Sequence, residues 1–234
     1  MKTTQKGFTL VEIAIVLVII GLLLGGVLKG QELINSAKVK NFANDFRNIP
    51  VYIYGYQDKF KSLPGDHSTA ATQLTGATNA TTPATCGSGT SACIGNGKLD
   101  GNWEPANKTD ETFLFWQHVR LANLAPGATD TAVGTITDFL PKNADGGIIG
   151  IESGSNHYIK DSAAGATTFM PGTYVVCSKG ILGKFAKQLD TTLDDGNTQT
   201  GSLRVVADNH TRGNAAVATT DVDDATTYIV CQGI

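Results

Sequence analysis

The chain has 234 residues, a formal net charge of −3 and a charged fraction of 17%. This length accommodates one large domain or one domain with an appended segment. The slight excess of acidic side chains excludes a basic surface for nucleic acid as the main partner, so no dedicated nucleic-acid site is expected. Glycine, threonine and alanine are abundant, which is more typical of an exported, loop-rich domain than of a cytosolic enzyme.

An apolar segment lies almost at the amino terminus. From Phe8 to Leu28 the only charged side chain is that of Glu12, and a helix of this length spans about 30 Å of hydrocarbon. A cleaved secretory signal peptide has a shorter apolar region followed by a small-x-small cleavage site, whereas this segment continues into KGQELINSAKVKN. A carboxylate within a membrane helix costs about 2.5–3.5 kcal/mol and usually has a partner. Glu12 is therefore expected to meet a cation from its own or a neighbouring chain, unless it reaches water at the membrane interface.

The stretch KGFTLVEIAIVLVIIGLL, from Lys6 onward, resembles the amino terminus of type IV prepilins and of the pseudopilins of type II secretion. In that family a prepilin peptidase cuts after the glycine that ends a short basic leader and methylates the new terminal residue. The resemblance implies a leader over residues 1–7, cleavage between Gly7 and Phe8, and N-methylation of Phe8. It also implies a role in assembly for Glu12, which matches the near-terminal glutamate of the family.

The helical pattern continues beyond the apolar segment, so residues 8–30 and 31–62 are predicted to form the apolar and amphipathic halves of one spine helix. Six apolar residues recur at steps of three and four and predict a stripe that docks on a globular head: Phe42, Phe46, Ile49, Ile53, Tyr56 and Phe60. Pro50 lies inside the pattern and predicts a kink rather than an end.

Four glycines interrupt the apolar half of the spine as two G-x-x-x-G pairs: Gly21, Gly25, Gly26 and Gly30. Each glycine costs a helix up to about 1 kcal/mol relative to alanine. They predict local unwinding inside an assembled filament, and the alternative is close packing of neighbouring helices.

Residues 63–234 are expected to form an α+β head, a mainly antiparallel sheet with additional short helices, and together with the spine a pilin fold. LPGD, at residues 63–66, ends the spine helix in a type II turn. Helices are predicted over residues 110–123 and 178–195. Strands are predicted at TITDFL (135–140), GIIGIES (147–153), NHYIK (156–160), TYVVC (173–177), SLRVVAD (202–208) and TYIVC (227–231).

Four cysteines follow the apolar segment, and an even number in an exported domain predicts disulfides, for which three pairings are possible. Cys86 and Cys93 are close in sequence and favour a bridge that pins a threonine-rich surface loop. Cys177 and Cys231 end the similar strands TYVVC and TYIVC, which favours a bridge between neighbouring strands. Zinc is the alternative, but no C-x-x-C pair and no histidine at ligand spacing supports it.

No catalytic motif is present, because the four histidines are scattered and the chain has neither a G-x-S-x-G elbow nor a Walker loop. Calcium is the one ion considered, since it prefers clustered carboxylate and carbonyl oxygens. Its first candidate ligands are Asp190, Asp194 and Asp195, just before GNTQTG, and secretion pseudopilins bind calcium in carboxy-terminal loops. NGKLDGNWE (96–104) and the acidic residues of 221–224 are further candidates. For each cluster, a solvated acidic turn is the alternative.

These observations predict a structural subunit of an extracytoplasmic filament, not an enzyme. A type IV pilus serving adhesion, surface motility or DNA uptake is favoured by the large head and threonine-rich loop, and a pseudopilin of a type II secretion system is the alternative. A monomeric membrane-anchored domain would leave Glu12 without a partner. The expected partners are further copies of the chain, the prepilin peptidase and the inner-membrane assembly machinery. The precursor is expected in the inner membrane, and the filament at the cell surface or, for a pseudopilin, in the periplasm.

Overall fold

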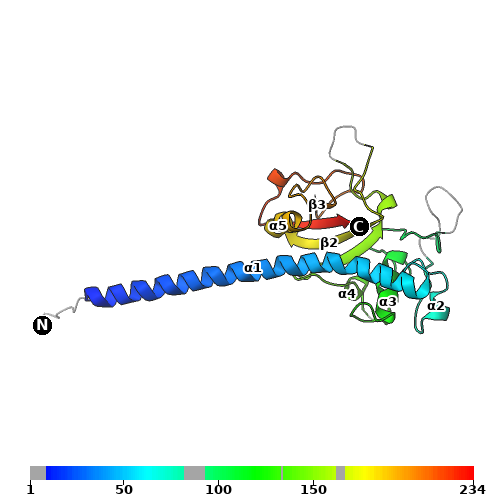
Figure 1. Cartoon of the computed structure of the whole chain (residues 1–234), viewed down its shortest axis with the longest axis horizontal. Helices are drawn as coiled ribbons and strands as arrows, with labels where there is room; N and C mark the ends of the chain where they lie inside the picture. The colour runs from blue at the N-terminus through cyan, green and yellow to red at the C-terminus, as the bar shows by residue number, and fades with distance from the viewer. Residues whose placement is uncertain (1–8, 82–92, 133, 162–166) are drawn as a thin grey trace. The chain divides into compact units, whose positions relative to one another are not determined.

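The computed structural model describes residues 9–81, 93–132, 134–161 and 167–234 (Figure 1). By compactness the chain divides into two units, Met1–Lys40 and Asn41–Ile234. Within the described residues, a long amino-terminal helix, several short helices and a four-stranded antiparallel sheet make up an α+β architecture, as predicted.

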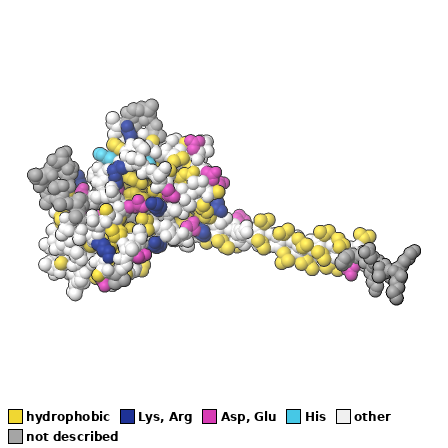
Figure 2. Space-filling model, turned by 180° about the vertical axis from the view of Figure 1, so that it is seen from behind, with side chains coloured by type: hydrophobic (Ala, Val, Ile, Leu, Met, Phe, Trp, Pro, Cys, Tyr) yellow, Lys and Arg dark blue, Asp and Glu magenta, His cyan; other side chains and the backbone are white. Residues whose placement is uncertain are grey.

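Helix α1 (Leu10–Phe60) contains 51 residues and continues from the first unit into the second. Pro50 lies inside α1 and does not end it, in agreement with the continuing apolar stripe. In the first unit every side chain from Leu10 to Leu28 is exposed, and Leu10 reaches 91% exposure. Figure 2 shows these apolar side chains along the amino-terminal part of the helix. By its length and composition α1 is able to cross a membrane.

The part of α1 in the second unit docks through the predicted stripe. Five of its six residues are at most 1% exposed: Phe42, Phe46, Ile49, Ile53 and Tyr56. The ring of Phe42 lies 6.2 Å from that of Phe185, between centroids, and Tyr56 packs with Leu74 and Ala122. The periodicity of the sequence therefore identified the buried face of this helix correctly.

The spine helix ends at Phe60, slightly before the predicted LPGD turn, because Lys61 adopts a left-handed conformation at φ +54°. Gly65 has φ +91°, and a Cβ atom at this position would lie 2.4 Å from the backbone carbonyl oxygen of Glu111. Glycine is required here on both counts, because side chains rarely adopt that backbone conformation and no room exists for one. The turn leads into the short helix α2 (Ala70–Gln73).

The two longer head helices are close to their predicted positions. Helix α3 (Glu111–Leu121) follows Asp110 and is buried along nearly its whole length. Helix α5 (Gly183–Leu193) begins later than predicted, because Ser178–Leu182 extend a strand instead. The register of that strand shifts between Ser178 and Ile181, around Gly180 at φ +75°.

The sheet has the order β1-β2-β4-β3, and all neighbouring strands are antiparallel. Its strands are β1 (Ile149–Ser153), β2 (Tyr174–Leu182), β3 (Leu203–Ala207) and β4 (Thr227–Gly233). Four of the predicted strands are therefore confirmed. One side of the sheet contributes to a core that includes Trp103, Ile159 and Met170.

Two predicted strands are wrong. TITDFL forms the one-turn helix α4 (Ile136–Phe139), because Thr135 and Asp138 build a capping box in which each side chain accepts from the backbone of the other. NHYIK follows the 3-10 turn η1 (Gly154–Asn156), and His157 adopts a left-handed conformation at φ +58°. Lys160 makes only isolated bridges, to Phe169 and Ala215, so no regular strand forms there. A second 3-10 turn, η2 (Thr219–Asp221), precedes β4.

Candidate functional site

The amino-terminal turn of α1 provides hydrogen-bond partners for Glu12. Its Oε2 accepts from the backbone N and from Oγ1 of Thr9, each at 2.8 Å, and Thr9 Oγ1 accepts from the backbone N of Glu12 at 3.3 Å. This is a capping box of the T-x-x-E type, which the sequence analysis missed although the signature was visible. The carboxylate is thus satisfied at the helix start, while Gly7 and Phe8, the predicted cleavage positions, lie outside the described residues.

The glycines of the apolar half lie within continuous helix. A Cβ atom added at Gly21, Gly25, Gly26 or Gly30 would meet no atom within 4 Å. These positions therefore have no packing role among the described residues of a single copy. Because glycine has no side chain, these positions form shallow depressions on a helix segment whose apolar side chains are all exposed.

The predicted bridge between Cys177 and Cys231 is present. The two residues are direct partners in the antiparallel register of β2 and β4, and both side chains are fully buried. Cys93 is also disulfide-bonded, whereas Cys86 lies outside the described residues, so the pairing of Cys86 with Cys93 stays a prediction.

The predicted calcium ligands do come together at the carboxyl end of α5. One carboxylate oxygen from each of Asp190, Asp194 and Asp195 lies within 4.8 Å of the others. Asp190 is fully buried, and neither of its oxygens has a hydrogen-bond partner. Burial, together with the charges of Asp195 and Asp194, raises the pKa of Asp190 to about 7. A buried carboxylate without a donor lacks the compensation that such groups normally have.

The other two aspartates of this cluster are held by the following loop. Asp194 Oδ2 accepts from the backbone N of Leu203 at 2.8 Å. Asp195 accepts from the backbone N of Asn197 and from Oγ1 of Thr200, both at 2.9 Å. The loop therefore fixes two carboxylates beside that of Asp190, which has no hydrogen-bond donor. Three carboxylates in this arrangement offer the hard oxygen ligands that suit a calcium ion.

The alternative acidic clusters are committed to contacts within the protein. In the first, Asp100 accepts from the side chain of Asn96 at 2.6 Å, and Glu104 pairs with Lys179 at 2.8 Å. In the second, Asp224 pairs with Lys187 at 2.6 Å. These residues form turns and ion pairs, which favours the alternative of an acidic turn over a calcium site for both segments.

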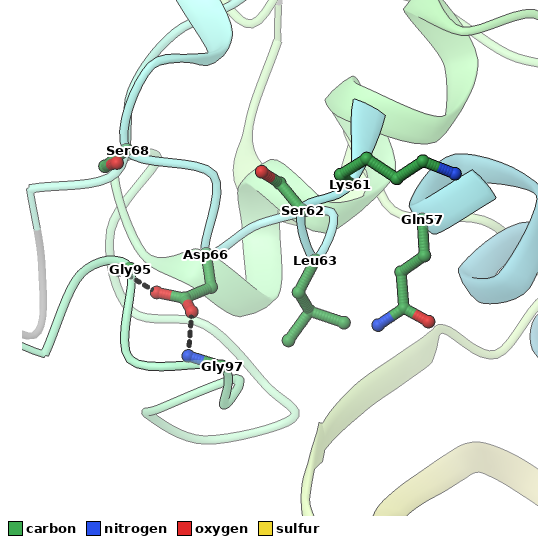
Figure 3. A pocket seen from close by; sticks show the side chains of 8 residues that line it. All are labelled: Gln57, Lys61, Ser62, Leu63, Asp66, Ser68, Gly95 and Gly97. Carbon is green, nitrogen blue, oxygen red and sulfur yellow. Dashed lines mark hydrogen bonds between the residues drawn. The ribbon is translucent and has the colours of Figure 1, made fainter. Parts of the chain in front are cut away.

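The sequence analysis missed a buried carboxyl pair at the LPGD turn, Asp66 and Glu111. Figure 3 shows Asp66 of this pair with Gly95 and Gly97. Asp66 accepts from the backbone N of Gly95 and, at 2.6 Å, from that of Gly97. Glu111 is fully buried. Its Oε2 accepts from the backbone N of Asp100 at 2.7 Å, and its Oε1 has no donor.

Protonation of Glu111 removes the repulsion between its carboxylate and that of Asp66. Burial raises the pKa of Glu111 to about 9, and the charges of Asp66 and Asp100 contribute to the shift. Glu111 is consequently a neutral carboxylic acid at pH 7. Burial also raises the pKa of Asp66, and the three backbone amides that point at its carboxylate oppose this shift. A cavity of about 510 Å³ opens beside Asp66, lined also by Lys61, Ser62 and Ser68. The pair connects the turn, the loop before Asp100 and α3.

Two histidines that are distant in the sequence meet around Tyr56. Tyr56 Oη lies 2.8 Å from His67 Nδ1. His118 Nδ1 accepts from the backbone N of Gly65 at 2.9 Å, so its Nε2 carries the proton and donates to the carbonyl oxygen of Thr78 at 2.9 Å. Burial lowers the pKa of His118 to about 4. Both nitrogens of His118 are used for hydrogen bonds, to Gly65 and to Thr78, and its ring stacks on Tyr56 of α1. His118 therefore connects two loops to the spine helix.

The comparisons with known proteins bear on the amino terminus. Residues 2–28 match the family profile described as the prokaryotic N-terminal methylation motif. This motif is the hallmark of type IV prepilins and pseudopilins, so the chain begins as a prepilin-type protein does. The long apolar helix and the antiparallel sheet complete a pilin-like α+β architecture. Searches of curated proteins and of solved structures found no match to the chain.

Proposed function

We propose that this chain is the structural subunit of an extracytoplasmic type IV pilus. The observation that carries the proposal is the methylation motif at residues 2–28, which includes the apolar helix segment whose side chains are exposed from Leu10 to Leu28 in the described part of one copy. Such a segment is stable in a membrane or among other apolar helices, since exposure to water forfeits about 25 cal/mol per Å² of apolar surface. A precursor in the inner membrane and a filament of spine helices satisfy this requirement in turn.

The proposed maturation follows the motif. A prepilin peptidase removes residues 1–7 by cutting between Gly7 and Phe8, and the amino group of Phe8 is methylated. Residues 8–30 then form the apolar filament core, residues 31–62 the amphipathic half of the spine, and residues 63–234 the displayed head. In the filament, the amino group of a neighbouring Phe8 takes the place of Thr9 as the partner of the Glu12 carboxylate.

A pseudopilin role in type II secretion is the second candidate, because the same motif serves both classes. The large head favours a displayed pilus surface with roles in adhesion, motility or DNA uptake. Shearing of intact cells separates the two candidates: a pilus subunit is recovered in released filaments. A pseudopilin is not recovered in this way, and its deletion instead leaves secreted proteins in the periplasm.

The processing step has its own test. Gly7→Val should block the close approach of the peptidase to the backbone, so that the unprocessed precursor accumulates in the inner membrane and filaments are absent. Gly30→Val is a matched control outside the cleavage position and should be processed normally. A mature Gly7→Val protein of normal length would contradict the prepilin assignment of the cleavage site.

We also propose that Asp190, Asp194 and Asp195 hold a calcium ion in the head. The donorless, fully buried Asp190 favours this reading over a solvated turn. Calcium should raise the thermal unfolding temperature of the purified full chain, since a ligand at a hundred times its Kd stabilises the folded state by about 2.7 kcal/mol. Asp190→Asn should abolish the shift, and Asp221→Asn, in the other acidic turn, should retain it. Equal unfolding temperatures of the wild type in calcium and in chelator would reject the site.

A further inference from the structure

A small hollow lies on the second unit where α1 faces the segments after α3 and before β1. It has a volume of about 160 Å³ and is lined by residues that include Asp45, Tyr52, Trp116 and Lys142. Trp116 Nε1 is buried and has no hydrogen-bond acceptor. The hollow therefore contains polar groups that the described part of a single copy leaves incompletely satisfied.

Asp45 and Lys142 both line this hollow, and Asp45 is its anionic group. Its side chain is half-buried, and among the described residues it makes no ion pair, not even with the neighbouring Lys142. Burial raises the pKa of Asp45 to about 6, so at pH 7 the carboxylate is still mainly ionised. A partly desolvated anion of this kind is stabilised most by a cation that brings its own hydrogen-bond donors.

Arg47 offers such a cation on the same helix but on another face. It is exposed and forms no ion pair within the described parts of the chain. Residues two positions apart in an α-helix are separated by about 200° around the axis, so Arg47 points away from the hollow that contains Asp45. The two side chains can meet only between copies.

We infer that the hollow around Asp45 receives Arg47 of a neighbouring copy of this chain. The inference rests on the proposed filament. Because donor and acceptor surfaces lie on different faces, each copy offers both at once, and the contact is heterologous. Repetition of a heterologous contact generates an open helical assembly, whereas an isologous contact would close a dimer. The guanidinium group also suits the site, since its planar fork binds a carboxylate bidentately and stacks on an aromatic ring such as that of Tyr52.

The test uses the full-length chain in cells that assemble wild-type filaments. Asp45→Arg and Arg47→Asp should each reduce the yield of sheared filaments at least tenfold, because each places like charges across the contact. The double variant, in which the charges are exchanged, should recover most of the wild-type yield. Lys59→Asp is the control, an identical charge change at an exposed position of the same helix, and it should leave the yield unchanged.

Folding and assembly are separated by a second measurement. Arg47 is exposed, so the detergent-solubilised Arg47→Asp chain should unfold at the wild-type temperature while its filaments are lost. Normal filament yield from either single variant, or no recovery in the double variant, would overturn the pairing. Absence of filaments from the wild-type chain would instead contradict the proposed function, and the two failures are therefore distinguishable.

Discussion

Replacement of the buried Glu111 by glutamine should make the protein more stable at alkaline pH. The glutamine side chain is not charged, has nearly the shape of the glutamic acid, and keeps an oxygen that can accept from the backbone N of Asp100. Its amide group, like the protonated carboxyl group of Glu111, adds no negative charge beside Asp66 and Asp100, whose charges contribute to the raised pKa of Glu111. The substitution Glu111→Gln thus removes a titration while retaining the hydrogen bonds of the turn.

The sign and size of the effect follow from the pKa of Glu111, which burial raises from 4.5 to about 9. Between these values the folded chain holds a proton that the unfolded chain has lost, so the free energy of unfolding falls as pH rises. The limiting slope for one group is about 1.4 kcal/mol per pH unit. Between pH 5 and pH 8 the wild type should therefore lose up to about 4 kcal/mol from this group, whereas Glu111→Gln loses nothing from it.

The assay is urea unfolding of the detergent-solubilised chain at pH 5, 6.5 and 8, followed by the fluorescence of the buried Trp103 and Trp116. The difference between variant and wild type cancels the other titrating groups. It should be within about 1 kcal/mol of zero at pH 5 and should favour the variant increasingly toward pH 8. Glu104→Gln is the matched control at a partly exposed glutamate. An unchanging difference between Glu111→Gln and wild type across this range would refute a neutral Glu111.

Four further expectations concern assembly and stability. Glu12→Ala should insert into the membrane at least as well as the wild type but assemble poorly, since an unpaired amino group in an apolar bundle costs several kcal/mol. A wild-type filament yield would contradict the pairing of Glu12 with the amino group of Phe8. Loss of the bridge between Cys177 and Cys231, which are 54 positions apart, should cost about 4 kcal/mol in denaturant unfolding, and an unchanged midpoint would count against this estimate. The lowered pKa of His118 should reduce stability as pH falls from about 6.5 to 4, by up to about 3 kcal/mol, and His118→Gln should lack this loss when both are unfolded in parallel. In a filament map at side-chain resolution, residues 21–30 should be locally unwound, and continuous helical density with a neighbouring helix against the glycine Cα atoms would assign them to packing instead.

Periodic and local patterns made much of this fold predictable. The spacing of Phe42 and its successors identified the docked face of α1, because burial on one side of a helix requires that period. The same position of Cys177 and Cys231 in the similar sequences TYVVC and TYIVC predicted both adjacency and the disulfide, since a bridge requires the two cysteines to lie opposite each other on neighbouring strands. The carboxylate cluster at Asp190 was visible because its members are close in sequence.

The remaining features depend on contacts that no local pattern contains. Residues 135–140 have the composition of a strand, but the hydrogen bonds between Thr135 and Asp138 favour one helical turn. Asp66 and Glu111 are far apart in the sequence, and only the folded turn brings the two carboxyl groups together. The same holds for His67 and His118, whose ring centroids lie 6.4 Å apart. Scattered positions in a sequence thus say little about proximity when the connecting loops are long.

The position of β4 has a consequence for the timing of head folding. This strand follows the other three along the chain, yet it lies inside the sheet between β2 and β3. During synthesis β1 can pair with β2 early, whereas β3 has β4 as its partner strand and β2 presents an open edge until β4 is made. An open edge invites pairing with other chains, which is a hazard wherever several incomplete copies are close together. The disulfide between Cys177 and Cys231 closes that edge covalently, so its formation marks heads in which β4 has taken its place in the sheet.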